Sequence, residues 1–395
     1  MSQRPISRSA DLKKLRDEGY DLQIRSGCLL VKDVPYVNSC KEVKRGILVM
    51  KLVLADDETS CPDDHVAYFS GDHPCNEDGT EIAKIKHDSG ERSLADGVVI
   101  QHSFSAKPKP NDFYPDYYAK VTTYVAILSG PASRIDPTAT AKTFPLIEPE
   151  KDTEEPFNYI DTASSRAEIV AVTKKLALRK IAIVGLGGTG SYVLDLVAKT
   201  PVREIHLYDG DSFLQHNAFR SPGAPSGDDL RAKQPKATYF KNLYGKRHCG
   251  IVDHAVYVDA ANVEELRSVD FVFLCLDKGS AKKVIVEKLE EFNLPFTDVG
   301  MGIQLNEEAL GGIVRITTST AQMRDHFRSR VSFTDGASDD DYNRNIQIAD
   351  LNALNASLAV IKWKKLFGFY RDLKFEHHSQ FSIDGNLLLN EDRPQ

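Results

Sequence analysis

The stretch over residues 181–191 constrains the fold more than any other part of the chain. An apolar, largely β-branched run at 181–184 leads directly into a turn with four glycines, Gly185, Gly187, Gly188 and Gly190. A strand, a glycine turn and a helix start in this order are typical of the phosphate-binding turn of a Rossmann-type unit. Glycines let the backbone approach a phosphate, and the amides at the helix start supply partial positive charge. We therefore expect a nucleotide-binding α/β domain.

The region from about residue 158 onward alternates strands with helices, as a doubly wound fold does. Apolar runs predict five strands, at 180–184, 204–209, 251–258, 269–276 and 295–299. Helical periodicity predicts helices at 191–199, 228–243, 279–292 and 346–367. A return strand at the paired glycines Gly311 and Gly312 follows the fifth strand. The expected fold class is therefore α/β, with a Rossmann-like, mostly parallel sheet.

The residues ahead of this region predict a separate, mixed α/β domain. Its expected elements are a helix at 10–20, a hairpin through 22–24 and 28–32, strands at 46–54, 65–69 and 98–104, and a helix around 121–128. Prolines then punctuate a polar, acidic stretch that is typical of a linker. We predict an N-terminal domain over 1–135 that docks a partner, a linker over 136–157 and a nucleotide domain over 158–395.

Composition limits the class of protein. A chain of 395 residues with 41% hydrophobic content has room for two domains. The net charge of −7 gives no general electrostatic support for nucleic-acid binding. No apolar run approaches the roughly 18 residues of a membrane span, and the first 20 residues lack a signal-peptide core. We expect a cytoplasmic protein that binds neither membrane nor nucleic acid.

Polar residues beyond the glycine turn follow an order that suits triphosphate chemistry. A ribose-binding acid is expected about 20 residues past the turn, where Asp209 and Asp211 stand. Asn217 and Arg220 follow them in the chain. An arginine and an asparagine at the mouth of a nucleotide fold favour triphosphate chemistry over hydride transfer, since a guanidinium binds phosphate through two hydrogen bonds.

Each of these residues also has an ordinary structural interpretation when it is taken singly. A glycine turn of this kind holds NAD or FAD in many proteins. Arg220 and Lys236 are, by type, surface side chains. Asp277 precedes a predicted helix and suits an N-cap. A nucleotide-triphosphate site is favoured over these separate roles because the order and spacing of the residues together match the motif pattern of a known enzyme family.

This series of motifs resembles the ThiF-type and ubiquitin-activating family of adenylating enzymes, over roughly residues 158–370. The family pattern is an arginine ahead of the first strand, GxGGxG-S, D-x-D, N-x-x-R, a lysine, an aspartate and a paired-glycine return. Arg166 supplies the first arginine here. The resemblance implies ATP as substrate, with Asp209 on the ribose hydroxyls, Asp211 supporting that corner and Asn217 also binding the cofactor. It also implies phosphate contacts from Arg220 and Lys236, Mg²⁺ at Asp277, and a homodimer in which Arg166 acts in trans.

The chain departs from the family pattern in its cysteines. Members that form a thioester carry a cysteine after the paired glycines, but no cysteine follows Cys275. Cys275 lies in a buried-strand context that favours a core role, and Cys249 precedes the third strand, away from the expected site. CxxC pairs are also absent, so no structural zinc is expected. In the first domain, the two cysteines and two histidines over 61–75 match no common zinc spacing and favour loop roles.

The favoured interpretation is ATP-dependent adenylation of the C-terminus of a ubiquitin-like protein, for transfer to a ubiquitin-conjugating-type protein. The region before the nucleotide domain resembles the uncharacterised domain of some bacterial ubiquitination-like systems, and the partner's tail would pass beneath residues 317–345. Two alternatives within adenylation are activation of a sulfur-carrier protein and modification of a short peptide or tRNA base. From other classes, the alternatives are an NAD-dependent oxidoreductase and an inactive binding scaffold.

Overall fold

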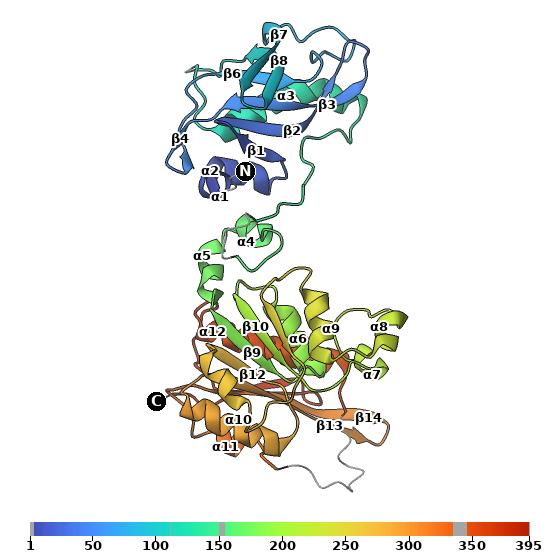
Figure 1. The fold of residues 1–395 in the computed structure, drawn as a ribbon, viewed down its shortest axis with the longest axis vertical. Coiled ribbons are helices and arrows are strands. Elements are labelled where there is room, and N and C mark those ends of the chain that lie inside the picture. The colour runs from blue at the N-terminus through green and yellow to red at the C-terminus, as the bar shows by residue number, and fades with distance from the viewer. Residues whose placement is uncertain (1–3, 111, 150–154, 335–345, 395) are drawn as a thin grey trace. The chain divides into compact units, whose positions relative to one another are not determined.

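The computed structural model describes residues 4–110, 112–149, 155–334 and 346–394, which form two compact units (Figure 1). By its contacts, the first unit holds residues 1–153 and 159–167, and the second holds 154–158 and 168–395. Among the described residues, every helix is too short or too polar to cross a membrane.

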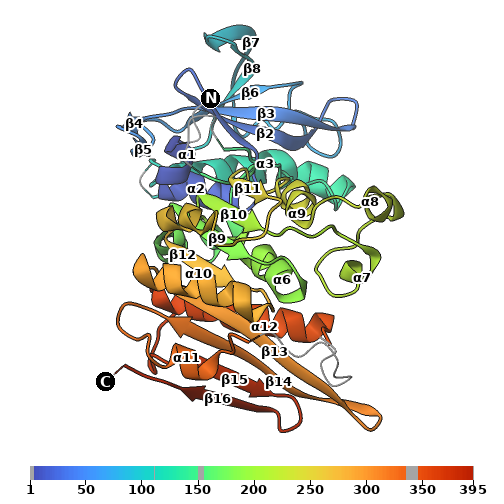
Figure 2. The same ribbon diagram turned by 60° about the horizontal axis from the view of Figure 1, so that its bottom comes forward.

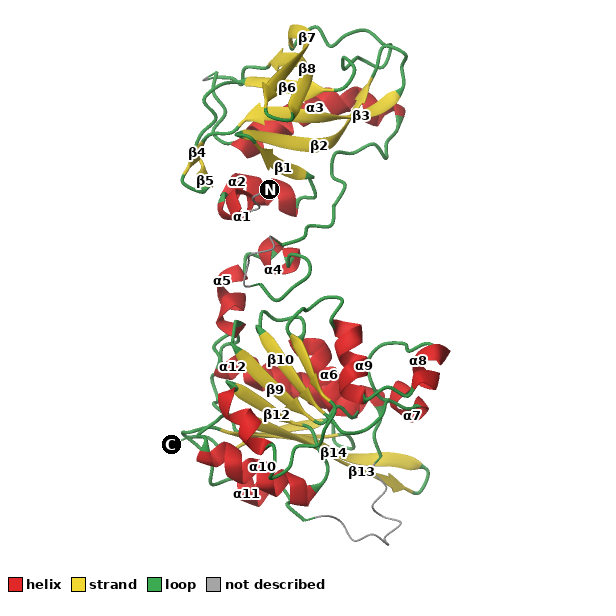
Figure 3. Cartoon of the chain, in the orientation of Figure 1, coloured by secondary structure: helices red, strands yellow, loops and turns green. Residues whose placement is uncertain are grey.

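The first unit is built on a six-stranded antiparallel sheet (Figure 3). In spatial order its strands are β1 (Leu22–Arg25), β2 (Cys28–Val37), β3 (Val43–Lys51), β6 (Val66–Ser70), β8 (Val98–Ser105) and β7 (Lys86–Ala95). Its other elements are α1 (Arg4–Arg8), α2 (Ala10–Asp17), β4 (Leu54–Ala55), β5 (Glu58–Thr59), α3 (Tyr117–Ile135) and α4 (Thr162–Arg166). Apolar residues of α2 and α3 pack into one core with those of β2 and β3. The predicted mixed α/β domain, including its first hairpin, is confirmed.

The predicted linker contributes to the first unit. Helix α3 continues through Pro131 to Ile135. Ala139 and Ala141, which follow it, are buried among the apolar residues of the first unit. At least this part of the 136–157 segment therefore packs against the unit instead of spanning open solvent.

The second unit contains an eight-stranded sheet in which five parallel strands are followed by three antiparallel ones. In spatial order these are β11 (Ile251–His254), β10 (Glu204–Tyr208), β9 (Lys180–Val184), β12 (Phe271–Leu274), β13 (Phe296–Asn306), β14 (Ala309–Ser319), β15 (His378–Ser382) and β16 (Leu387–Glu391). Figure 2 shows β13 to β16 lying side by side. The α/β class and the Rossmann-like, mostly parallel sheet are confirmed, and β13 is longer than predicted.

Helices cover both faces of this sheet because its central strands are apolar on both faces. On one face, Ile183 and Phe273 share a core with residues of α6 (Gly188–Val197) and α12 (Ala349–Leu366). On the other face, Val184 and Leu274 pack with residues of α10 (Gly279–Glu291). The shorter helices of this unit are α5 (Val170–Thr173), η1 (Lys174–Leu176), α7 (Gln215–Ala218), α8 (Gly227–Ala232), α9 (Lys236–Tyr244), η2 (Val263–Ser268) and α11 (Phe327–Arg330).

The prediction of one helix over 228–243 is wrong, since the structure has two helices there, α8 and α9. Lys233 adopts a left-handed backbone conformation (φ 45°) at the end of α8. Pro235, which lacks an amide hydrogen and disfavours a helical residue before it, stands at the N-cap of α9. The break places Lys236 at the first residue of a helix.

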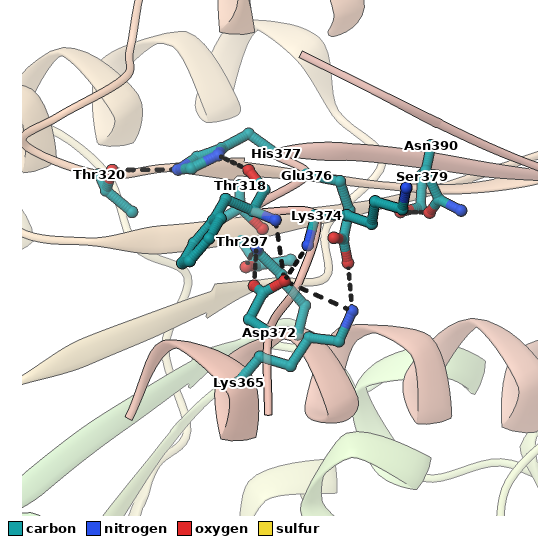
Figure 4. A network of polar contacts seen from close by, with 12 residues as sticks. Thr297, Thr318, Thr320, Lys365, Asp372, Lys374, Glu376, His377, Ser379 and Asn390 are labelled. Carbon is teal, nitrogen blue, oxygen red and sulfur yellow. Dashed lines mark hydrogen bonds and ion pairs between the residues drawn. The ribbon is translucent and has the colours of Figure 1, made fainter. Parts of the chain in front are cut away.

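A polar network fixes the antiparallel end of the sheet (Figure 4). Lys365 of α12 pairs with the buried Glu376 at 2.6 Å, just before β15. Within the hairpin, the Ser379 hydroxyl donates to Asn390 at 2.7 Å. These contacts join β15 and β16 to the helical layer and to each other.

Candidate functional site

A cavity of about 650 Å³ opens at the carboxyl ends of β9, β10 and β12 and continues along β13 and β14. The chain passes from β9 through α6 to β10 on one side, whereas β12 lies on the other side of β9. The direction of the connections therefore reverses between β9 and β12. Open α/β sheets bind their ligands in the crevice at such a switch point.

The glycine turn forms one wall of this cavity, and its shape requires glycine. Gly185 has a φ of +93°, and an added Cβ there would lie 2.5 Å from a backbone oxygen of Cys275. A Cβ on Gly190 would lie 1.9 Å from the carbonyl oxygen of Gly185. Gly187 and Gly188 line the cavity at the start of α6, where amides and the helix dipole favour an anion.

We expect Gly190→Ala to lower the melting temperature, because its Cβ would collide with the backbone oxygen of Gly185 and force the turn apart. Gly187→Ala is the matched control in the same turn, since its Cβ would meet only the Gln347 side chain, at 3.9 Å. It should keep the melting temperature and lose nucleotide affinity, as the methyl group would enter the cavity. Calorimetry and nucleotide titration of both variants check this, and equal melting temperatures would contradict it.

Asp209 follows β10 and links it to the glycine turn by a hydrogen bond. It is 7% exposed, and its two carboxylate oxygens accept hydrogen bonds from the Leu186 amide at 2.7 Å and the Asp211 amide at 2.8 Å. A carboxylate oxygen has a further lone pair, so these bonds leave acceptor capacity for a ribose hydroxyl. Asp209 lines the cavity.

Asp211 and Lys236 form an ion pair beside it. Asp211 Oδ2 lies 2.7 Å from Lys236 Nζ, and the Tyr257 hydroxyl donates to Asp211 Oδ1. Burial acts to raise the pKa of Asp211, but hydrogen bonds from Lys236 and Tyr257 outweigh it and lower the pKa. Lys236 is only 5% exposed, so the sequence-based interpretation of a solvated surface lysine does not hold. It is a buried cation that lines the cavity.

Arg220 supplies a second cation to this wall. It lines the cavity, and its Nε is buried without a hydrogen-bond partner among the described residues. A buried donor that lacks an acceptor is costly, more so on a charged group. An anion bound beside Arg220 would supply the missing acceptor.

Three predicted site residues lie outside the cavity lining of the second unit. Asn217 is 3% exposed, and its Oδ1 accepts from the Leu214 amide at 2.8 Å, so it holds the turn that carries Arg220. Gly190 packs within the glycine turn. Arg166 belongs to α4 of the first unit, with its guanidinium 6.0 Å from the centre of the Phe144 ring. Its role in trans stays a prediction.

Asp277 is exposed and lines the cavity between β12 and α10. A single carboxylate with room for water and phosphate oxygens is an arrangement that Mg²⁺ accepts. Within the described ranges, no three His, Cys, Asp or Glu side chains are grouped to hold a metal ion. Mg²⁺ at Asp277 would therefore take its other ligands from solvent and from a bound phosphate.

The structure also brings into the cavity a group that the sequence did not reveal. Asp298 on β13 is fully buried and pairs with Lys282 of α10 at 2.6 Å and with Arg315 of β14 at 2.9 Å. Lys282 and Arg315 line the cavity. The sequence carried one signal of this cluster: Asp298 and Arg315 are charged residues within stretches that form strands β13 and β14.

The cysteines near the second sheet lack the environment of a nucleophile. Cys275 directly follows β12, and burial raises the pKa of its thiol, which disfavours the reactive thiolate. Cys249 is exposed but precedes β11 at the amino end of the strand, opposite the cavity. Its neighbour His248 is buried, with Nε2 bonded to the Val202 carbonyl at 2.8 Å and Nδ1 accepting from the Gly250 amide.

The cysteine and histidine cluster of the first unit makes local contacts. The Cys61 thiol donates to the Pro115 carbonyl, and the Cys75 thiol donates to the His73 carbonyl. All six cysteines of the chain are free thiols. These contacts support local structural roles for Cys61 and Cys75.

Family models match a part of each unit. Residues 163–330 match the ThiF family, and residues 10–162 match a domain of unknown function, DUF6791. Ubiquitin-like modifier-activating enzyme 5 of Aedes aegypti is 23% identical over 164 residues, which are 39% of this chain and 40% of that protein. The Gallus gallus enzyme of the same name is 24% identical over 179 residues, or 42% and 44%. The chain thus spans less than half the length of these relatives.

Solved structures that resemble the chain include E. coli MccB with MccA-N7isoASN, at a TM-score of 0.48 and 18% identity over 59% of this chain and 70% of that one. E. coli MccB with ATP gives a TM-score of 0.44 at 18% identity, over the same shares of the two chains.

Proposed function

We propose, from the premise that residues 163–330 form a ThiF family domain, that this chain uses ATP to adenylate the C-terminal carboxylate of a ubiquitin-like protein. The observation that carries the proposal is the cation pair Arg220 and Lys236 beside the glycine turn, with Arg220 Nε lacking an acceptor among the described residues. Adenylation brings a carboxylate to a triphosphate, so both charges need to be offset. Hydride transfer from a nicotinamide does not bring a carboxylate and a triphosphate together, so it needs no such pair of cations.

The residues divide the work by position. The amides of the glycine turn would bind phosphate oxygens, and Asp209 would accept from a ribose hydroxyl. Arg220 and Lys236 would stabilise the negative charge that grows on the phosphates. Asp277 would hold Mg²⁺, which supplies further charge neutralisation on the phosphates when it is bound.

Transfer beyond the adenylate would use a nucleophile from another protein, since Cys275 lines the cavity with a thiol whose pKa is raised by burial and Cys249 lies away from the cavity. We propose that a ubiquitin-conjugating-type protein of a bacterial system supplies it, and that the first unit docks this protein or the ubiquitin-like partner. The partner's tail would pass residues 317–345 on its way to Asp277. The acidic run at 339–341 in that segment lies outside the described residues.

The test is ATP–pyrophosphate exchange by the full chain with a panel of ubiquitin-like proteins that end in glycine, sulfur-carrier proteins and short peptides. Exchange that depends on a ubiquitin-like protein supports the proposal, and exchange only with sulfur carriers or peptides favours those alternatives. NADH fluorescence quenching without exchange would favour the oxidoreductase. ATP binding without exchange for any member would favour an inactive scaffold.

Mixed dimers test the proposed role of Arg166. If Arg166 completes the site of a second subunit, a dimer of one Arg166→Ala and one Asp277→Ala subunit retains one site with neither change. Partial exchange activity, up to half of wild type, should then return when the two inactive variants are mixed. Differently tagged subunits purified in tandem establish that the dimer is mixed. A verified mixed dimer without activity would place Arg166 in cis.

A further inference from the structure

A second pair of cations lines the same cavity on its β13–β14 side. Lys282 Nζ lies 2.6 Å from Asp298 Oδ1, and Arg315 Nη1 lies 2.9 Å from Asp298 Oδ2. Asp298 is fully buried, and Lys282 is 4% exposed. Two positive charges thus share one negative charge, which leaves a net charge of +1 on this wall.

The backbone beside Arg315 is shaped around its guanidinium. Arg315 stands opposite Gly300 in the register of β13 and β14, and a Cβ on Gly300 would lie 2.6 Å from Arg315 Cζ. Arg315 donates through Nη1 both to Asp298 and to Thr317. The Arg315 guanidinium is therefore anchored through one nitrogen and packs against Gly300. Arg315 also lines the cavity.

The sheet topology separates this pair from the first one. Arg220 and Lys236 follow β10, whereas Lys282 and Arg315 belong to elements beyond β12. The switch point between β9 and β12 lies between the two pairs. One cavity is therefore lined by two separate pairs of cationic side chains, as suits a reaction between two anions.

We propose that Lys282 and Arg315, held in place by Asp298, bind the carboxylate that is to be adenylated. This inference rests on the proposed function and assigns its acyl subsite. A net charge of +1 matches one carboxylate, and a guanidinium binds a carboxylate through two parallel hydrogen bonds. In the reaction, a carboxylate oxygen forms a bond to the α-phosphorus of ATP. The bond from that phosphorus to the bridging oxygen breaks, and pyrophosphate leaves with the electron pair.

The test compares Arg315→Lys, Lys282→Met and the control Lys283→Met in the full chain. Lys283 follows Lys282 on α10 but is exposed. The ubiquitin-like protein that supports exchange in the wild type serves as the acyl probe, and ATP alone serves as the nucleotide probe in calorimetric titrations. We expect the KM for the acyl probe to rise at least tenfold in both cavity variants, with the Kd for ATP within twofold of wild type. Lys283→Met should match wild type in both.

Arg315→Lys keeps the charge that pairs with Asp298, so this variant should stay folded and can still be compared with wild type if Lys282→Met has a low melting temperature. A tenfold loss of ATP affinity in Arg315→Lys would assign the pair to the nucleotide and overturn the inference. An unchanged KM for the acyl probe in that variant would mean that the cluster is only a structural ion pair, and it would also overturn the inference. Failure of the proposed function is distinct, because the wild type itself would then give no exchange with any partner.

Discussion

Replacement of Asp277 by alanine is expected to abolish ATP–pyrophosphate exchange while the chain stays folded. Asp277 is exposed at the cavity wall, so its loss removes little packing. It is also the carboxylate to which we assign Mg²⁺, and the phosphates would lose that charge neutralisation. The measurement is the exchange rate with the partner protein over a range of Mg²⁺ concentrations, together with the melting temperature.

Asp228→Ala is the matched control for this variant. Its carboxylate is 91% exposed on α8 and pairs only with a neighbouring surface arginine in the described contacts. The control should exchange at the wild-type rate. Undiminished exchange by Asp277→Ala would remove Asp277 from the metal role, and a large drop in melting temperature would show that it supports the fold.

Arg220→Ala is expected to lower the turnover of exchange about 100-fold or more. Its Nε is buried without an acceptor within the described ranges, so a donor already stands at the cavity wall before any ligand arrives. A donor held this way stabilises charge that develops in the transition state without reorganising. Removing it should therefore reduce kcat more than it weakens ATP binding.

Arg231→Ala provides the comparison, since that guanidinium is 78% exposed on the surface of α8. Steady-state kinetics of both variants separate kcat from KM, and titration with ATP measures ground-state affinity. If Arg220→Ala changed only ATP affinity, Arg220 would serve ground-state binding. We expect the Arg231 variant to be indistinguishable from wild type.

The site features that the sequence did not predict depend on contacts between residues far apart in the chain. Asp298, Lys282 and Arg315 come from two strands and a helix, and they meet because β13 and β14 pair in one register and α10 covers that face. No local spacing encodes such a contact, since it depends on which strands become neighbours. The same holds for Asn217, whose amide supports a turn instead of lining the cavity.

Residues of the candidate site whose place depends on local chemistry could be predicted from the sequence. Gly185 is required by its positive φ, and Gly190 by its close approach to the backbone of Gly185, five residues away, so both act locally. Asp209 and Asp277 follow strands of one parallel sheet, and the carboxyl ends of such strands share an edge, so both side chains line one cavity. The burial of Lys236 and the presence of Lys282 and Arg315 in the same cavity came only from the folded structure, because both depend on which elements pack together.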